Sequence, residues 1–279
     1  MSRRYELADE QWELIELILP KRTAQTGRKP RDPRPMLNGM VWILRSGAPW
    51  RDLPERYGPW QTVYDYYRHW RNNGTFDRFL SALHVRLDPN GRIDGDLWCI
   101  DGSSVRAARA AAGAAKSLTP HPQEPADHAW GRSRGGWGSK FHLVTDGRGL
   151  PPAVEVTLGQ RHESTQVEAV MDTIAIPQPV GRPRKRPKRL AGDKGYSYST
   201  IRRWLRAHGI TVVIPRKSNQ RKGRGPFDKK NYRRRSVIEQ CVGWLKECRR
   251  IGIRFEKLAI SFLAMFKLAM IQRYLTLMF

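Results

Sequence analysis

The sequence has few cysteines, and they are not spaced to bind a metal. Cys99, Cys241 and Cys248 are the only ones among 279 residues. An odd count without a Cys-x-x-Cys pair argues against a disulfide framework and a structural zinc module, and favours a reduced, cytosolic protein. Four histidines also lack zinc-ligand spacing and a cysteine partner, and we interpret them as loop and strand residues: His121, His128, His142 and His162.

Long uninterrupted apolar runs are also missing. The first ten residues, MSRRYELADE, contain no apolar core of the kind found in signal peptides. The segment ISFLAMFKLAMIQRYLTLMF, residues 260–279, is about as long as a bilayer is thick, but Lys267 and Arg273 interrupt it. We expect a packed core helix and no membrane partner.

Acidic residues are scarce relative to basic ones. The chain has 51 Lys and Arg against 26 Asp and Glu, a formal net charge of +25. Such an excess destabilises a compact fold by self-repulsion unless a polyanion offsets it. Nucleic acid is therefore the expected partner, in particular double-stranded DNA. A generic basic protein, such as a ribosomal one, is the alternative that charge alone leaves open.

The first part of the chain, residues 1–90, is expected to be an all-helical DNA-binding domain. Apolar residues recur at helical spacing in four segments, with Pro20, Gly47 and Gly74 as stops, Pro59 as a start and Thr75 as an N-cap. A helix, a tight link and a helix rich in Tyr, Trp and Arg predict a helix-turn-helix-like reader.

The third of these helices divides into core positions and candidate DNA contacts. Its apolar members are spaced 3 and 4 apart, which favours core packing: Val63, Tyr66 and Trp70. We predict that Gln61, Arg68 and Arg71 contact DNA.

From about residue 91 to 279 the pattern predicts an α/β catalytic domain with C-terminal helices. In the segment DLWCID alternate side chains fall on opposite sides, which predicts a strand. We expect a hairpin over residues 140–159, with its turn at Asp146-Gly147, and a helix over residues 164–176, capped by Ser164 or Thr165. Residues 105–117 and 131–140 are expected to be irregular, and GRPRKRPKR, residues 181–189, cannot be helical. Helices and strands then alternate, which is compatible with an RNase H-like mixed sheet flanked by helices.

The stretch NYRRRSVIEQCVGWLKECRRIGIRF, residues 231–255, carries the first candidate site. On one continuous helix, Tyr232, Arg235, Glu239 and Lys246 fall on a narrow polar stripe opposite an apolar face. A lone carboxylate among cations suggests a metal ligand. The alternative is that Arg235 and Glu239 form only a structural i, i+4 ion pair on a solvated helix face.

Two more carboxylates end predicted strands. Asp101 closes DLWCID and Asp193 lies in LAGDKGY, positions where α/β sheets often carry sites. Each could instead cap the turn that follows it. That turn interpretation is the one we give to four other acids: Asp94, Asp96, Asp127 and Asp146.

Three clustered acids could not all stay ionised without a cation. Mg²⁺ prefers oxygen ligands, and two such ions about 4 Å apart can hold both oxygens of a phosphoryl displacement. We therefore predict that Asp101, Asp193 and Glu239 are catalytic metal ligands for two Mg²⁺ ions, with Mn²⁺ able to substitute. Tyr232, Arg235, Lys246 and Lys194 are the predicted phosphate and DNA contacts nearby.

These residues resemble a known family. Tyr-x2-Arg-x3-Glu-x6-Lys is the signature of one group of bacterial insertion-sequence DDE transposases, and it is present here with every spacing kept. CIDGSSVRA and LAGDKGYSY resemble the family's two Asp motifs, and GQRHES resembles part of the stretch between them. WRDLPERYGPWQTVYDYYRHWRNNGTFDRF resembles the N-terminal domain of the insertion-sequence-five branch.

The resemblance implies an RNase H-like catalytic domain and DNA cut-and-join chemistry on an element's terminal inverted repeats, by at least a dimer in the bacterial cytoplasm, at the nucleoid. The short interval between Asp193 and Glu239 leaves no room for a large β insertion, so hairpin-forming cleavage is not implied. Two alternatives remain: a domesticated DNA-binding protein without catalysis, and a structure-specific nuclease on the same fold. Three features are expected to meet DNA, or else to be solvated loops or core: GRPRKRPKR, RKSNQRKGRG and the Trp130–Trp137 pair.

Overall fold

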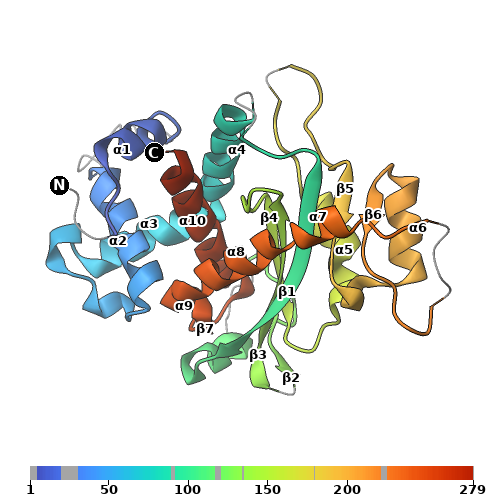
Figure 1. Ribbon diagram of the computed structural model, residues 1–279. Helices are drawn as coiled ribbons and strands as arrows, with labels where there is room; N and C mark the ends of the chain where they lie inside the picture. Colours follow the sequence, from blue (N-terminus) through green and yellow to red (C-terminus); the bar gives the residue numbers. More distant parts are fainter. Residues whose placement is uncertain are drawn as a thin grey trace.

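The computed structural model describes residues 5–19, 31–88, 92–116, 121–133, 135–178, 180–220 and 225–278. Its N-terminal part is helical, as predicted (Figure 1). Two short 3₁₀ turns, Trp50–Asp52 and Glu55–Tyr57, link the second helix to the third. The four helices are α1 (Asp9–Glu16), α2 (Pro33–Ser46), α3 (Trp60–Asn72) and α4 (Thr75–Leu87).

Local sequence signals set most of these helix ends. Gly47 closes α2 with a left-handed φ of 72°, which glycine adopts without a Cβ clash. Pro59 precedes α3, as expected for a helix start. The prediction that Thr75 is an N-cap is wrong, because Thr75 is already helical and Gly74 holds the cap position. The Asn73 side chain does the capping instead, accepting from the Thr75 N–H at 3.1 Å.

A mixed sheet forms the centre of the rest of the chain. Antiparallel pairs join β3 to β1, β4 and β2, while β5 is parallel to β1 and β6 is parallel to β5. The order β4-β3-β1-β5-β6 confirms the predicted mixed sheet. The strands are β1 (Leu97–Ala107), β2 (Gly131–Ser133), β3 (Gly136–Asp146), β4 (Ala153–Leu158), β5 (Arg189–Ala191), β6 (Thr211–Val213) and β7 (Ile253–Arg254).

The region predicted to be irregular is more ordered than expected. β1 continues to Ala107, a 3₁₀ segment spans Arg109–Lys116, and within the predicted range 131–140 the structure places β2 (Gly131–Ser133) and the start of β3 at Gly136. Glycine explains the difference: a Cβ on Gly138 would lie 2.1 Å from the Val105 carbonyl oxygen. The glycines that suggested a loop here permit close approach of neighbouring strands.

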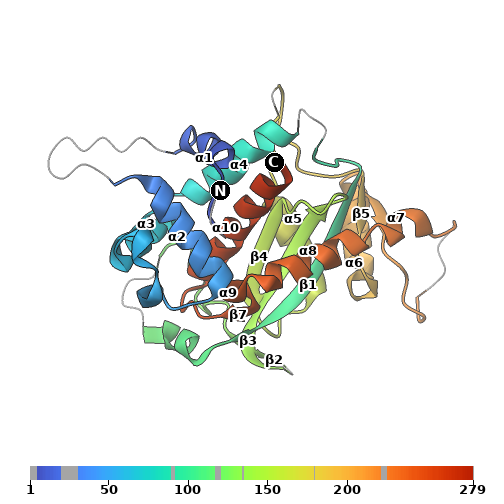
Figure 2. The same cartoon turned by 60° about the vertical axis from the view of Figure 1, so that its left-hand side comes forward.

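Helices pack around the sheet (Figure 2). α5 contacts β3 and β4, while α8 crosses β1 and β3. The cap predicted at Ser164 or Thr165 is His162, whose Nδ1 accepts from the Ser164 N–H at the start of a 3₁₀ turn, Glu163–Gln166. The helices are α5 (Val167–Asp172), α6 (Ser199–Ala207), α7 (Lys229–Arg233), α8 (Ser236–Glu247), α9 (Arg249–Gly252) and α10 (Ala259–Met278).

The apolar C-terminal segment is a packed helix, as predicted. α10 lies against α4, α2 and β4, and its two interrupting cations are engaged: Lys267 pairs with Asp77 at 2.6 Å, and Arg273 donates to the Gly149 carbonyl. By length and composition α10 could cross a bilayer, but 67% of its most apolar window is buried in the protein. One hydrophobic core runs through α10 from the N-terminal helices to the sheet. The division into domains 1–90 and 91–279 stays a prediction.

Candidate functional site

The sheet brings Asp101 and Asp193 to neighbouring positions. β1 and β5 are parallel, and Cys99 pairs with Ala191 in their register. Each aspartate lies two residues beyond this pair, so both lie at the carboxyl end of β5, next to β1. Acids placed this way can act together on one ligand.

Asp101 is largely buried in a negative environment. Its carboxylate accepts the Gly102 N–H at 2.9 Å. Burial raises the pKa of Asp101 to about 6, against the opposing effects of that hydrogen bond and of Arg235, and the carboxylates of Asp193 and Glu163 raise it further. Ionised Asp101 therefore needs a nearby positive charge.

Asp193 combines a structural role with its place beside Asp101. It caps a short 3₁₀ turn, Lys194–Tyr196, by accepting the Gly195 N–H at 2.7 Å. The turn-capping alternative thus describes a real contact. It does not exclude a second role, because this hydrogen bond uses one carboxylate oxygen.

Arg235 links Asp101 to Glu239. Its guanidinium lies 3.6 Å from the Asp101 carboxylate and forms an i, i+4 ion pair with Glu239. Although burial opposes it, the negative charges of Glu239 and Asp101 hold the pKa of Arg235 above its usual value. The Glu239 side chain is 56% exposed. A single cation therefore bridges two of the three predicted metal ligands.

We predicted that this signature lies on one continuous helix, but the structure divides it between two helices. α7 ends at Arg233 and α8 begins at Ser236, with Arg234 turned aside to pair with Asp94 at 2.6 Å. The predicted stripe is therefore bent between Tyr232 and Glu239. Arg235 still lies over the Tyr232 ring at 5.9 Å, and Lys246 is exposed near the end of α8. The apolar face is confirmed at four buried positions: Ile238, Cys241, Leu245 and Cys248.

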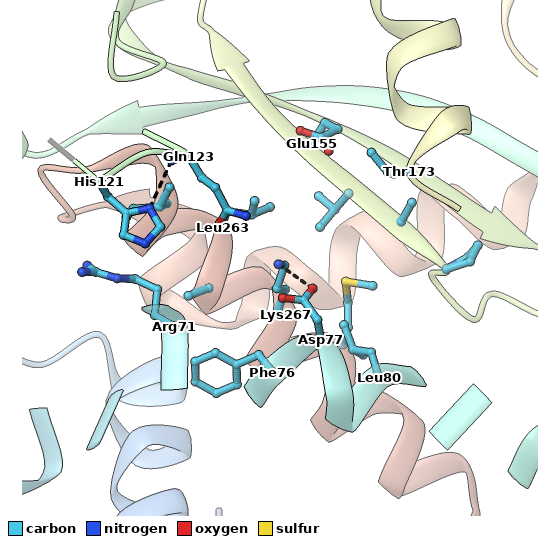
Figure 3. A pocket seen from close by; sticks show the side chains of 16 residues that line it. Arg71, Phe76, Asp77, Leu80, His121, Gln123, Glu155, Thr173, Leu263 and Lys267 are labelled. Carbon is cyan, nitrogen blue, oxygen red and sulfur yellow. Dashed lines mark hydrogen bonds and ion pairs between the residues drawn. The ribbon is translucent and has the colours of Figure 1, made fainter. Parts of the chain in front are cut away.

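The other predicted DNA contacts lie in different settings. Lys194 is exposed directly after Asp193, and Gln61 is exposed at the start of α3. Arg68 is exposed and lies 3.8 Å from Asp65. Arg71 turns toward α10, donates to the Ser261 hydroxyl and lines a cavity of about 380 Å³ between the helical part and β4 (Figure 3). The core assignment on α3 is confirmed at Val63, Tyr66 and Trp70.

The four histidines and two tryptophans have partners within the protein. His128 contacts Glu124 at 2.7 Å, and His142 contacts the Thr157 hydroxyl at 2.8 Å. His121 accepts the Gln123 N–H, and His162 contacts the Ser164 hydroxyl. The two indole rings stack on each other with centroids 6.0 Å apart: Trp130 and Trp137.

The carboxylates suit a divalent cation in kind, although they are not gathered around one point. Within the described ranges, no three His, Cys, Asp or Glu side chains are close enough to hold a metal as they stand. Arg235 occupies the space between Asp101 and Glu239 and supplies the positive charge there. Oxygen donors around a desolvated acid match Mg²⁺ in chemical kind. To hold one ion together, the acid side chains would have to move closer and the Arg235 guanidinium would have to leave the space between Asp101 and Glu239.

Two further residues belong to this region, and no local pattern in the sequence pointed to them. The carboxylate of Glu163 and the hydroxyl of Tyr196 are coupled electrostatically to Asp101 or Asp193. The motif GQRHES contains Glu163, but its own pattern is that of a turn. Glu163 is an acid at the first turn after a strand of the sheet. This position indicates a nearby site only when the order of the strands is known.

Comparison with known proteins identifies related sequences for both parts of the chain. Residues 7–80 match the family described as "Putative transposase of IS4/5 family", and residues 93–272 match "Transposase DDE domain". The "Putative transposase for insertion sequence element IS402" of Burkholderia cepacia is 35% identical over 140 residues, covering 47% of this chain and 63% of that protein. The chain thus spans less than two thirds of that relative. "Uncharacterized protein y4sN" of Sinorhizobium fredii is 38% identical, covering 40% of this chain and 84% of its own length.

Solved transposase structures share a distant likeness. The piggyBac transposase synaptic complex with hairpin DNA is 13% identical, with a TM-score of 0.35, and the match covers 77% of this chain and 50% of that one. The Mos1 strand transfer complex is 12% identical, with a TM-score of 0.28, covering 81% and 82%. The RNase H-like assignment rests instead on the strand order and on the DDE domain match.

Proposed function

Because this chain belongs to the family of DDE transposases, we propose that it binds the terminal inverted repeats of an insertion sequence, cleaves them to free 3′-OH ends and joins those ends to target DNA. The observation that carries the proposal is the meeting of Asp101, inside β1, with Asp193, just past the end of the neighbouring β5, while Arg235 links Asp101 to Glu239. Cleavage and joining are both in-line phosphoryl displacements, so one site serves both steps.

Asp101, Asp193 and Glu239 would hold the divalent cations, two Mg²⁺ ions for which Mn²⁺ substitutes. Bound there, the cations supply charge neutralisation and an activated nucleophile. Arg235, once displaced from between the acids, is positioned to hold a phosphate oxygen, and Tyr232 lies beside it to hydrogen-bond the backbone. Lys194 and Lys246 are exposed and supply further phosphate contacts.

The proposed partners are element ends and target DNA, both double-stranded. Two ends must be cut together, so the active species is at least a dimer on DNA. The working compartment is the bacterial cytoplasm, at the nucleoid. The helical part supplies end recognition, with Gln61, Arg68 and Arg71 as candidate contacts.

The test is cleavage and joining of an end-bearing duplex in Mg²⁺. We expect Asp193→Asn to reduce the rate at least about 1,000-fold, since it would weaken the binding of the cation that stabilises the negative charge of the transition state. Asp172→Asn, at the exposed end of α5, is the matched control and should act as the wild type does.

Three outcomes would contradict the proposal. Equal cleavage rates for Asp193→Asn and wild type would show that Asp193 is not a catalytic residue. Cutting without joining would favour a structure-specific nuclease. Tight, sequence-specific binding without cleavage in either metal would favour a domesticated DNA-binding protein.

A further inference from the structure

A groove of about 1020 Å³ runs beside β6, the last strand in the sheet order. Its lining comes from α6, from β6 with the residues that follow it, and from residues 225–228 before α7. Four cations line it: Arg202, Arg206, Arg216 and Lys217. The one acid in the lining, Asp228, is already engaged, because its carboxylate accepts the Asn231 backbone N–H at 3.0 Å and side-chain amide at 2.7 Å. The groove is therefore strongly positive.

Three arginines of this groove lie close together without a compensating acid. Burial lowers the pKa of Arg202, and the positive charges of Arg216 and Arg206 lower it further. Among the described residues no carboxylate forms an ion pair with any of the three, whereas Arg234 at the end of α7 pairs with Asp94 at 2.6 Å. Like charges held together destabilise the fold unless an anion offsets them. The cluster therefore favours a negatively charged ligand.

Arg202 is anchored in the fold while one of its donors stays unpaired. Its Nη2 donates to the Ile214 carbonyl at 2.8 Å and to the Ser197 hydroxyl at 2.9 Å. Arg202 is only 8% exposed, yet its Nε has no hydrogen-bond partner in the part of the chain that the structure describes. A buried donor is costly until it finds an acceptor. Phosphate oxygens are suitable acceptors, because a guanidinium binds phosphate through its fork of N–H groups.

The groove adjoins the candidate site through aromatic side chains. Phe227, in the lining of the groove, packs against the Tyr232 ring with centroids 5.2 Å apart. Arg235 lies over the other side of this contact, 5.9 Å from the Tyr232 ring, and its guanidinium is 3.6 Å from the Asp101 carboxylate. A chain of direct neighbours thus leads from the candidate site to the groove.

The strand register points the same way. β5 and β6 are parallel, with Ala191 opposite Val213. Asp193 and Pro215 each lie two residues beyond this pair, and Arg216 follows directly. Neighbouring strands lie about 4.8 Å apart, and successive phosphates of one DNA strand advance by about 3.4 Å along the duplex axis. A DNA backbone at Asp193 would therefore reach the groove within a few phosphates.

We propose that this groove binds backbone phosphates of the DNA that occupies the candidate site, through its four cations. The inference rests on the proposed function for the presence of DNA, but phosphate binding is separable from cleavage. Arg216 and Lys217 begin the stretch RKSNQRKGRG, for which the sequence left DNA contact and a solvated loop open. Residues 221–224 of that stretch lie outside the described ranges. The groove adds two arginines of α6, Arg202 and Arg206, to the proposed DNA contacts.

The experiment measures binding of an end-bearing duplex to the full-length protein at several salt concentrations, by fluorescence anisotropy. Arg206→Gln combined with Arg216→Gln removes two cations and retains Arg202, which also supports the fold. The slope of log affinity against log salt should fall by about 1.8, because two phosphates are no longer neutralised. Arg203→Gln, exposed on the same helix outside the groove lining, is the matched control and should keep the wild-type slope. An unchanged slope in the double variant, or an equal decrease in the control, would overturn the proposal.

A photo-crosslink identifies what the groove holds. With p-benzoylphenylalanine in place of Phe227, which is 38% exposed, we expect crosslinking to the bound duplex. Crosslinking only to a second copy of the chain would show a protein interface instead. Saturable binding of inorganic phosphate, with the same DNA affinity in the double variant and wild type, would show a site for free anions. Either result would overturn the proposal.

The same measurements separate this proposal from the proposed function. Normal cleavage and joining with an unchanged salt slope would refute the groove alone. DNA crosslinked at position 227 without cleavage in Mg²⁺ or Mn²⁺ would refute the transposase proposal and leave the groove standing.

Discussion

At the scale of single residues, Asp101 and Asp146 show how one residue type serves two purposes. Burial raises the pKa of each to about 6. Asp146 accepts backbone N–H groups of Asp94, Arg148 and Leu150 at 2.8 to 3.0 Å, which confirms that it is a structural residue of the hairpin turn. Asp101 accepts one backbone N–H and faces Arg235 and other acids instead.

This difference predicts opposite effects of substitution. Asp146→Ala should lower the free energy of unfolding by about 3 kcal/mol, because it leaves several buried N–H groups without an acceptor. Asp101→Asn should keep or raise the free energy of unfolding, since it removes a desolvated charge, while it abolishes DNA cleavage. Urea unfolding and a cleavage assay on both variants would check this. Loss of stability in Asp101→Asn equal to that in Asp146→Ala would contradict it.

At the scale of elements, the sequence predicted best where a local signal fixes the backbone. Pro59 and Gly47 mark helix ends through φ preferences that need no tertiary partner. The extent of β1 could not be predicted in the same way, because its last residues are ordered by pairing with β3. The break between α7 and α8 also depends on a distant partner, since Arg234 reaches back to Asp94.

The candidate site divides along the same line. Asp193 and Glu239 could be singled out because a strand end and a spaced signature are local patterns. The prediction that Asp101 ends a strand is wrong, because β1 continues past it to Ala107. Glu163 could not be singled out, since its place depends on a glycine gap in a strand 61 residues earlier and on Lys140 from another strand. The position of Arg235 between two acids likewise follows from packing of α8 on β1.

The contact between α4 and α10 should make stability depend on pH. Burial lowers the pKa of His84 to about 4, although Asp88, which caps the C-terminus of α4, opposes this, and the ring contacts the Tyr274 hydroxyl at 2.9 Å. The unfolded chain takes up the proton near pH 6.5, so the contribution of neutral His84 is complete above that pH and is lost as pH falls toward 4. From pH 7 to 5 the loss should be about 2 kcal/mol.

Comparison with a variant isolates this effect. His84→Gln keeps a polar group facing Tyr274 but cannot titrate, so its free energy of unfolding should fall less between pH 7 and pH 5 than that of the wild type. His142, whose burial also lowers its pKa to about 4, cancels in the comparison. Parallel pH profiles for the two proteins, measured by urea unfolding, would refute the assignment to His84.

The β2–β3 hairpin presents an aromatic surface. Trp137 is 54% exposed and stacks on Trp130, over which the buried Arg254 guanidinium lies. If the pair stacks on an unpaired base, Trp137→Ala should weaken binding to DNA with an unpaired end by about 1 to 3 kcal/mol and leave fully paired DNA unaffected. Leu277→Ala, at another exposed apolar side chain, is the control for fluorescence anisotropy titrations. Equal weakening on both DNAs would exclude stacking.

At the scale of the whole molecule, the acidic residues do not neutralise all the basic ones, and a net charge of +25 remains. In the basic stretch 181–189, Arg184 pairs with Asp88 and Arg189 with Asp96, so these two cations are engaged in the fold. The stretch is non-helical, as predicted. Its four other cations are exposed, and one of them, Arg186, lies over the Trp204 ring at 5.7 Å. The other three are Arg182, Lys185 and Lys188.

These exposed cations predict a measurable salt dependence. Removing one cation that neutralises a phosphate should reduce the slope of log affinity against log salt by about 0.9, because fewer counterions are released from the duplex. Replacing Arg182, Lys185 and Lys188 with serine should therefore lower the slope by about 2 to 3 without changing the melting temperature. Replacing Arg184 and Arg189 with serine should instead lower the melting temperature, since Asp88 and Asp96 would then be left unpaired. An unchanged slope in the triple variant would mean that the stretch is a solvated loop and that the DNA path lies elsewhere on the basic surface.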